Sequence, residues 1–126
     1  MKKDVSLSFG KVIRQARRDK GYSQRELAKL IDVDYTYLSK LENDHAGYPP
    51  KADVIRSLAR HLDLAEREEE LIYLAGRITP DDEKVFEELV KQNYKQMPAL
   101  FRMWRDNPHS VQNLLRESTQ PENEEK

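Results

Sequence analysis

The chain contains no cysteine among its 126 residues. Disulfides and thiolate metal ligands are therefore excluded. No apolar run approaches the ~20 residues that a membrane-spanning helix needs, and the N-terminus shows no signal-peptide pattern. We expect a cytoplasmic protein with no membrane partner and no metal site.

Glycine and histidine are also scarce. Only four glycines occur, and none belongs to a phosphate-cradling glycine loop. The three histidines, at positions 45, 61 and 109, are scattered along the chain, and the acidic residues fall where helix caps and solvated faces explain them. We therefore expect no catalytic residues, no cofactor and no enzymatic activity.

The chain has no overall excess of positive charge, since its formal net charge is -1. The charge is nevertheless unevenly distributed. Residues 1–63 hold 13 Lys and Arg against 9 Asp and Glu, a net of +4, whereas residues 64–126 hold 9 against 14, a net of -5. The first half therefore suits a polyanionic partner, and the acidic half should point away from it or toward another subunit.

Residues 21–43 carry the most informative pattern, which predicts two short helices joined by a tight turn. Ser23 is placed to cap the first helix, with Glu26 at the capping-box position. The predicted buried face of this helix follows the i, i+3, i+4 spacing and consists of Leu27, Ala28, Leu30 and Ile31.

The turn itself has the residues that a steep helix crossing needs. Ala28 supplies a small side chain at the contact, Val33 supplies an apolar plug, and Asp32 tolerates a left-handed backbone. Asp34 is predicted to cap the second helix, whose buried positions would be Leu38 and Leu41.

The residues Gln24, Ala28, Val33, Leu38 and Glu42 stand at the spacing of the lambda-repressor-like helix-turn-helix family, which includes the Cro/C1 and xenobiotic-response-element type regulators. The resemblance extends from about Phe9 to Leu64. It implies an all-α, five-helix DNA-binding domain within residues 1–76. It also implies a transcriptional repressor that binds a palindromic or pseudo-palindromic operator in double-stranded DNA as a homodimer, associated with the nucleoid when bound.

In this family the second motif helix lies in the major groove, where its side chains reach base edges. The positions matching base-reading sites are Tyr35, Thr36 and Lys40, with Tyr37 and Ser39 as secondary candidates. Lys40 can donate to guanine O6 or N7, and Thr36 offers a hydroxyl and a methyl group that suits thymine. For Tyr37, packing against neighbouring helices is an equally good interpretation.

Phosphate contacts are expected around this helix. Gln24 matches a phosphate-holding position of the family, and the other candidates are Arg14, Ser23, Arg25, Asn43, His45, Tyr48 and Lys51. Arg17 and Glu42 match a family pair that bridges the first helix to the second motif helix, so their expected role is structural. Asp44 replaces the usual helix-ending Gly, which leaves the path of the following loop open.

Three further helices are predicted to complete the first domain. The first is basic, with an apolar face at Phe9, Val12, Ile13 and Ala16. A second runs from about 52 to 62 after the proline-containing loop 45–51, with Val54, Ile55, Leu58, Ala59 and Leu62 on one face. A third runs from 66 to 75, with Leu71, Ile72, Leu74 and Ala75, and Gly76 stops it.

The C-terminal region, residues 77–118, is also helical by pattern. Helices are predicted from about 80 to 96, 99 to 106 and 110 to 117, followed by a disordered acidic tail over residues 119–126. The apolar side chains of this region either cover the first domain or pair with a second subunit, and the second interpretation is favoured. The predicted dimerisation residues are Phe86, Leu89, Val90, Tyr94, Leu100, Phe101, Met103 and Trp104.

A second class of function fits the same pattern. The chain is alternatively a protein-interaction module, such as an antitoxin that binds a regulatory partner protein through its C-terminal helices.

Overall fold

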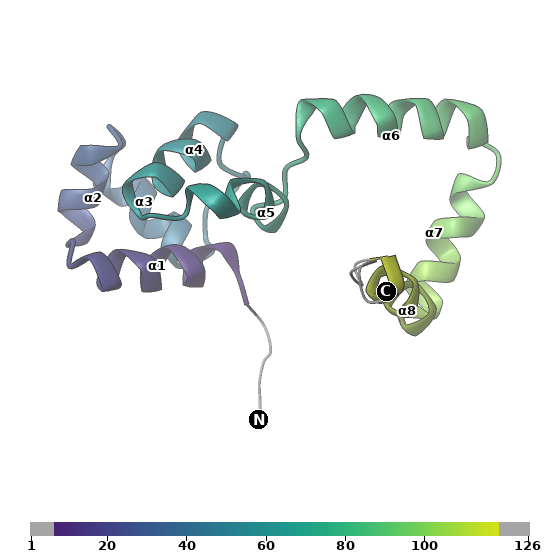
Figure 1. The fold of residues 1–126 in the computed structure, drawn as a ribbon, viewed down its shortest axis with the longest axis horizontal. Helices are drawn as coiled ribbons and strands as arrows, with labels where there is room; N and C mark the ends of the chain where they lie inside the picture. The colour runs from purple at the N-terminus through teal and green to yellow at the C-terminus, as the bar shows by residue number, and fades with distance from the viewer. Residues whose placement is uncertain (1–6, 119–126) are drawn as a thin grey trace, which may run out of the picture. The chain divides into compact units, whose positions relative to one another are not determined.

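The computed structural model describes residues 7–118, which form eight α-helices and one short 3₁₀ helix. The predicted all-α fold is confirmed. The chain divides into two compact units, Met1–Pro80 and Asp81–Lys126 (Figure 1). The acidic tail predicted at residues 119–126 lies outside the described residues.

The first unit contains the two predicted motif helices. They are α2 (Gln24–Leu30) and α3 (Tyr35–Glu42), and α3 packs against both α2 and α1 (Phe9–Lys20) (Figure 1). The remaining elements are α4 (Ala52–His61), the 3₁₀ helix η1 (Ala65–Arg67) and α5 (Glu68–Leu74), which pack against one another. The helix predicted over residues 66–75 is thus split into a 3₁₀ turn and a shorter α-helix.

The core of this unit is formed by one apolar side from each helix, as the spacing predicted. Its largest fully buried apolar side chains are Ile13, Leu27, Leu38, Ile55, Leu58 and Leu71. Ala28 is 3% exposed at the helix crossing, and Val33 packs against the core from the turn. The prediction was wrong for Leu30, which is 44% exposed, because α3 packs against the side of α2 that carries Leu27 and Ala28 and leaves Leu30 in solvent.

The local signals around the motif have the predicted geometry with one exception. The capping box is present: Glu26 N donates to Ser23 Oγ at 3.0 Å, and Ser23 N donates to Glu26 Oε1 at 2.7 Å. Asp32 adopts the predicted left-handed backbone, with φ 60°. Asp34 occupies the N-cap position of α3, but its carboxylate accepts the Thr36 hydroxyl at 2.9 Å and no backbone N–H of the helix.

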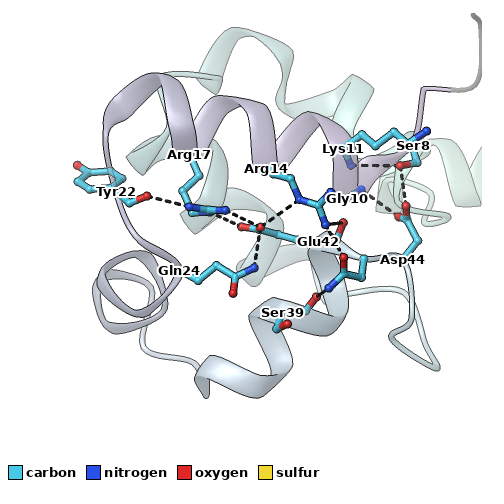
Figure 2. Close-up of polar contacts among 11 residues, drawn as sticks. Ser8, Gly10, Lys11, Arg14, Arg17, Tyr22, Gln24, Ser39, Glu42 and Asp44 are labelled. Carbon is cyan, nitrogen blue, oxygen red and sulfur yellow. Dashed lines mark hydrogen bonds and ion pairs between the residues drawn. The ribbon is translucent and has the colours of Figure 1, made fainter.

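Asp44 settles the loop path that the sequence left open. It adopts a left-handed backbone with φ 58°, in the place of the glycine that usually ends such a helix. Its carboxylate accepts the Gly10 N–H at 3.1 Å and the Ser8 hydroxyl at 2.7 Å, so the end of α3 is joined to the beginning of α1 (Figure 2). Asp44 therefore both ends one helix and accepts a backbone N–H from the first turn of another.

The second unit consists of α6 (Pro80–Asn93), α7 (Met97–Asp106) and α8 (Pro108–Ser118), of which α7 and α8 pack together. Phe101 and Trp104 stack with ring centroids 5.9 Å apart. None of the described residues of these three helices is buried. Of the predicted dimerisation residues, Val90 is half-buried and the other seven are between 42% and 63% exposed. No helix in residues 7–118 combines the length and apolarity needed to cross a bilayer.

Candidate DNA interface

The side chains predicted to read bases lie along α3, with Tyr35 and Thr36 in its first turn and Lys40 in its last turn. Thr36 and Lys40 are exposed, and Tyr35 is half-buried. The Arg25 guanidinium lies 4.2 Å from the centre of the Tyr35 ring, which is cation–π geometry. This stacking joins the first turns of the two motif helices, a contact that the sequence pattern did not indicate.

Tyr37 and Ser39 lie closer to the body of the domain. Tyr37 is half-buried and packs against the core. Burial raises the pKa of Tyr37 above its ordinary value of 10.0, with the charge of Arg77 opposing and that of Asp53 reinforcing the rise. These surroundings match the packing interpretation of Tyr37. Ser39 is also half-buried, and its backbone carbonyl accepts the Asn43 side-chain amide at 2.9 Å.

A buried carboxylate fixes the other end of α3. Glu42 is 1% exposed, and its oxygens accept Arg17 Nε at 2.7 Å and Arg17 Nη2 at 3.0 Å (Figure 2). Gln24 Nε2 donates to Glu42 Oε1 at 2.9 Å, so α1, α2 and α3 meet at this side chain. Arg17 also donates to the Tyr22 carbonyl at 2.9 Å. The structure therefore brings Arg17 and Glu42 together as a bidentate ion pair, the geometry in which guanidinium binds carboxylate best.

Arg14 and Asn43, two predicted phosphate ligands, form hydrogen bonds inside the protein. Arg14 Nη2 donates to the Glu42 carbonyl at 3.1 Å and to Asn43 Oδ1, and Arg14 Nε lies 3.7 Å from Glu42 Oε1 (Figure 2). Both side chains thus bind carbonyl groups at the C-terminal end of α3, which has no further turn to satisfy them. The pattern showed their position beside the motif but not this use of their polar atoms.

An open, basic depression lies where the three helices meet. Its lining includes four arginines. Their total positive charge exceeds the negative charge of Glu42, the buried carboxylate beside them. The lining residues are Arg14, Arg17, Arg18, Ser23, Gln24, Arg25, Tyr35, Ser39 and Asn43. Predicted base-reading and phosphate-binding residues therefore share one positively charged surface, and Arg18 joins them although the sequence did not single it out.

The loop between α3 and α4 carries the remaining predicted phosphate ligands. His45, Tyr48 and Lys51 are exposed, Tyr48 by 84%. Arg77, which follows α5, holds this loop: its Nε donates to the Pro50 carbonyl at 2.8 Å and its Nη2 to the Pro49 carbonyl at 2.9 Å. A single arginine after a helix-ending glycine gives no sign of such a contact in the sequence.

Within residues 7–118, no group of three or more His, Cys, Asp or Glu side chains is placed to hold a metal ion. The polar chemistry of the site consists of guanidinium, amide, hydroxyl and ammonium donors. These are the groups that phosphate oxygens and base edges accept.

The similarity of this chain to known proteins includes its helix-turn-helix region. Residues 13–68 match the family model described as helix-turn-helix, which spans α1 to the beginning of α5. A solved structure titled "SinR protein/SinI protein complex" is similar at 24% sequence identity and a TM-score of 0.44, covering 78% of this chain and 97% of that chain. No curated protein matches. Residues 13–68 therefore form a helix-turn-helix domain of the Cro/C1, lambda-repressor-like type, a DNA-binding domain of transcription regulators.

Proposed function

We propose that this chain is a sequence-specific repressor that binds a palindromic or pseudo-palindromic operator as a homodimer. One observation carries the proposal: α3 exposes Thr36 and Lys40 beside a surface lined by four arginines. A major groove accepts such a helix, and the phosphates on either side of the groove accept hydrogen bonds from Arg18 and Arg25, the two arginines of this surface that are exposed.

Direct reading of bases is assigned to Tyr35 and Thr36 in the first turn of α3 and to Lys40 in its last turn. Lys40 is exposed and donates to guanine, while Thr36 presents its methyl group to thymine. The Thr36 hydroxyl already donates to Asp34, so toward DNA it acts as an acceptor. Tyr35, braced by Arg25, supplies a flat apolar surface at the edge of the groove.

Phosphate binding is assigned to the rim of the same surface. Gln24 donates one amide hydrogen bond to Glu42, which orients its side chain, and Arg25 and Ser23 stand beside it at the beginning of α2. Arg14 and Asn43 hold the C-terminal end of α3 by hydrogen bonds to its carbonyl groups. His45, Tyr48 and Lys51 extend the contact along the backbone.

The test begins with selection from a random pool of DNA duplexes by the wild-type chain. The affinity for the selected duplex is then measured by fluorescence anisotropy at several salt concentrations. We expect Lys40→Ala with Thr36→Ala to weaken binding and to relax base preference, with each lost base contact contributing about 1–3 kcal/mol. Lys29→Ala, which removes the same charge from an exposed position of α2, is the matched control. Failure to enrich any sequence refutes specific reading.

Repression is tested with a reporter promoter that contains the selected duplex. A bound repressor blocks polymerase, so expression should fall when the chain is supplied and recover with the Lys40→Ala, Thr36→Ala variant. Increased expression identifies an activator instead.

Dimerisation is assigned to the second unit. Its helices bury none of their described residues, although the unit carries ten large apolar side chains that are 42–68% exposed. Charge favours a second copy as the partner, because α6 holds five Asp and Glu against two Lys, whereas α7 and α8 together hold three Arg against two acidic residues. A twofold dimer pairs unlike charges twice and reads two half-sites.

Sedimentation of the full chain at micromolar concentration should show a dimer. Leu100→Asp with Trp104→Asp places charges on the apolar side of α7 and should give a monomer, whereas Asn113→Asp, on an exposed position of α8, should not. A wild-type monomer refutes the homodimer. A stable complex of that monomer with a separate protein through these helices supports the antitoxin-like alternative.

A further inference from the structure

The loop between α3 and α4 is held by a residue far from it in sequence. Pro49 and Pro50 contribute no N–H groups, so this part of the loop cannot bind itself to its neighbours through its own donors. The two carbonyl oxygens instead accept the Arg77 guanidinium, at 2.9 Å for Pro49 and 2.8 Å for Pro50. One planar group thereby fixes two consecutive peptide units.

Arg77 is itself firmly placed. Gly76 ends α5 with φ +92°, and Gly76 N donates to the Tyr73 carbonyl at 3.0 Å while Arg77 N donates to the Ile72 carbonyl at 2.9 Å. A side chain at Gly76 would meet the Pro49 ring at 3.5 Å, so the helix end and the loop are in close contact. The backbone that carries the Arg77 side chain is therefore held in place by hydrogen bonds.

The neighbours of this contact are residues assigned to DNA. Tyr48 precedes the two prolines and Lys51 follows them, and both are exposed. The Arg77 charge also acts on Tyr37 of α3. Arg77 is thus hydrogen-bonded to the loop and close enough to Tyr37 of α3 to affect its pKa.

We propose that Arg77 is a positioning residue for DNA binding: its two hydrogen bonds preorganise the loop so that Tyr48 and Lys51 meet the phosphate backbone. This inference rests on the proposed function. Because its donors are directed to carbonyl oxygens of the protein, Arg77 acts through the loop. A loop that is ordered before binding loses less conformational entropy on DNA, which raises affinity.

The test is a double-mutant cycle in the full chain, measured on the selected duplex. Arg77→Ala should weaken binding about tenfold, the equivalent of having to order the backbone of roughly one more loop residue on DNA. Arg77→Lys should be nearly as weak, because an ammonium group does not present the flat fork that spans two carbonyls. Arg60→Ala, an exposed arginine of α4, is the matched control and should bind like wild type.

The second substitution in the double-mutant cycle shows whether Arg77 acts through the loop or contacts DNA independently. In a chain that carries Tyr48→Ala and Lys51→Ala, Arg77→Ala should have no further effect, whereas its effect should multiply with that of Lys40→Ala. Multiplication with the loop variants would show an independent phosphate contact and overturn the proposal. Full recovery by Arg77→Lys, or a neutral Tyr48→Ala, Lys51→Ala variant, would overturn it as well.

Hydrogen exchange of the free protein gives a reading that needs no DNA. Arg77→Ala should speed the exchange of the His45 and Val54 amides, which flank the loop and donate to the Lys40 and Lys51 carbonyls at 2.8 Å and 3.0 Å, and leave that of the α3 amides unchanged. If the exchange rates of these amides are unchanged, Arg77 does not hold the loop in place, and the proposal is refuted even where the wild type binds DNA. If the wild type selects no duplex but Arg77→Ala speeds the exchange of these amides, Arg77 does hold the loop and it is the proposed function that fails. A binding loss explained entirely by unfolded protein, measured by tyrosine near-UV circular dichroism, also refutes the positioning role.

Discussion

Replacing Glu42 by Gln should be among the most destabilising single changes in the first unit. Glu42 is 1% exposed and accepts two hydrogen bonds from Arg17 and one from Gln24. The glutamine keeps the shape of the side chain, but its amide nitrogen is a donor that must face other donors. It also leaves the 9% exposed Arg17 without a counter-charge.

The magnitude follows from breaking one side of a buried ion pair, which costs about 3–5 kcal/mol. Whole domains unfold with only about 5–15 kcal/mol, so this is a large fraction of the total. In a domain of 60–100 residues, each kcal/mol lowers Tm by roughly 4–8 °C. We expect Tm to fall by at least about 12 °C.

The assay must report on the first unit. The single Trp104 lies in the second unit, whereas five of the six tyrosines lie in the first, so near-UV circular dichroism of tyrosine is the suitable signal. Glu69→Gln, an exposed position of α5, is the matched control and should change stability by less than about 0.5 kcal/mol. A second measurement combines Glu42→Gln with Arg17→Met. The two losses should not add, because they remove the same hydrogen bonds. A Glu42→Gln chain within about 1 kcal/mol of wild type, or additive losses, would refute the reasoning.

Three further outcomes are expected. Gly10→Ala should lower Tm strongly, because its Cβ would lie 2.5 Å from two carbonyl oxygens of α3, whereas Gly47→Ala, with no atom within 4 Å, should be tolerated; equal effects of the two would be inconsistent with this packing. Asp44→Ala should cost about 0.5–2 kcal/mol in urea unfolding through loss of the α1 cap, and Asp44→Asn should recover most of it, so an unaffected Asp44→Ala chain would argue against the bridge. The raised pKa of Tyr37 means that the folded chain keeps this proton to higher pH than the unfolded chain. Stability from Tyr37 is therefore intact below about pH 10 and falls as pH rises further. An absorbance titration should lose a step above pH 10 in Tyr37→Phe, and an unchanged titration would contradict the assignment.

Features set by sequence neighbours were predictable. The capping box at Ser23, the left-handed Asp32 and the buried spacing of Leu27, Leu38 and Leu58 all depend on residues within a turn or two of each other. Such signals depend only on residues that are close together in the sequence. The predicted helices of the motif and the all-α fold were confirmed for this reason.

Features set by residues distant in sequence were not predictable. Asp44 binds Gly10, 34 residues away, and Arg77 binds Pro50, 27 residues away. Leu30 fits the apolar spacing yet is exposed, because only the neighbouring helices decide which part of that face is covered. For the same reason, the predicted use of Arg14 and Asn43 as phosphate ligands did not anticipate their hydrogen bonds to each other and to α3.

These distant contacts divide α3 into two functional parts. Its C-terminal end is fixed by Glu42 to α1 and α2 and joined by Asp44 to the first turn of α1. Its N-terminal end carries the exposed Thr36, which makes only a local hydrogen bond to Asp34. The energy that orients the helix is therefore concentrated away from Thr36, whereas Lys40 lies in the last turn, close to the buried Glu42. Substitution of Thr36 is therefore expected to change the recognised sequence without loosening the helix that presents it, whereas loss of Glu42 should displace Thr36 and Lys40 together.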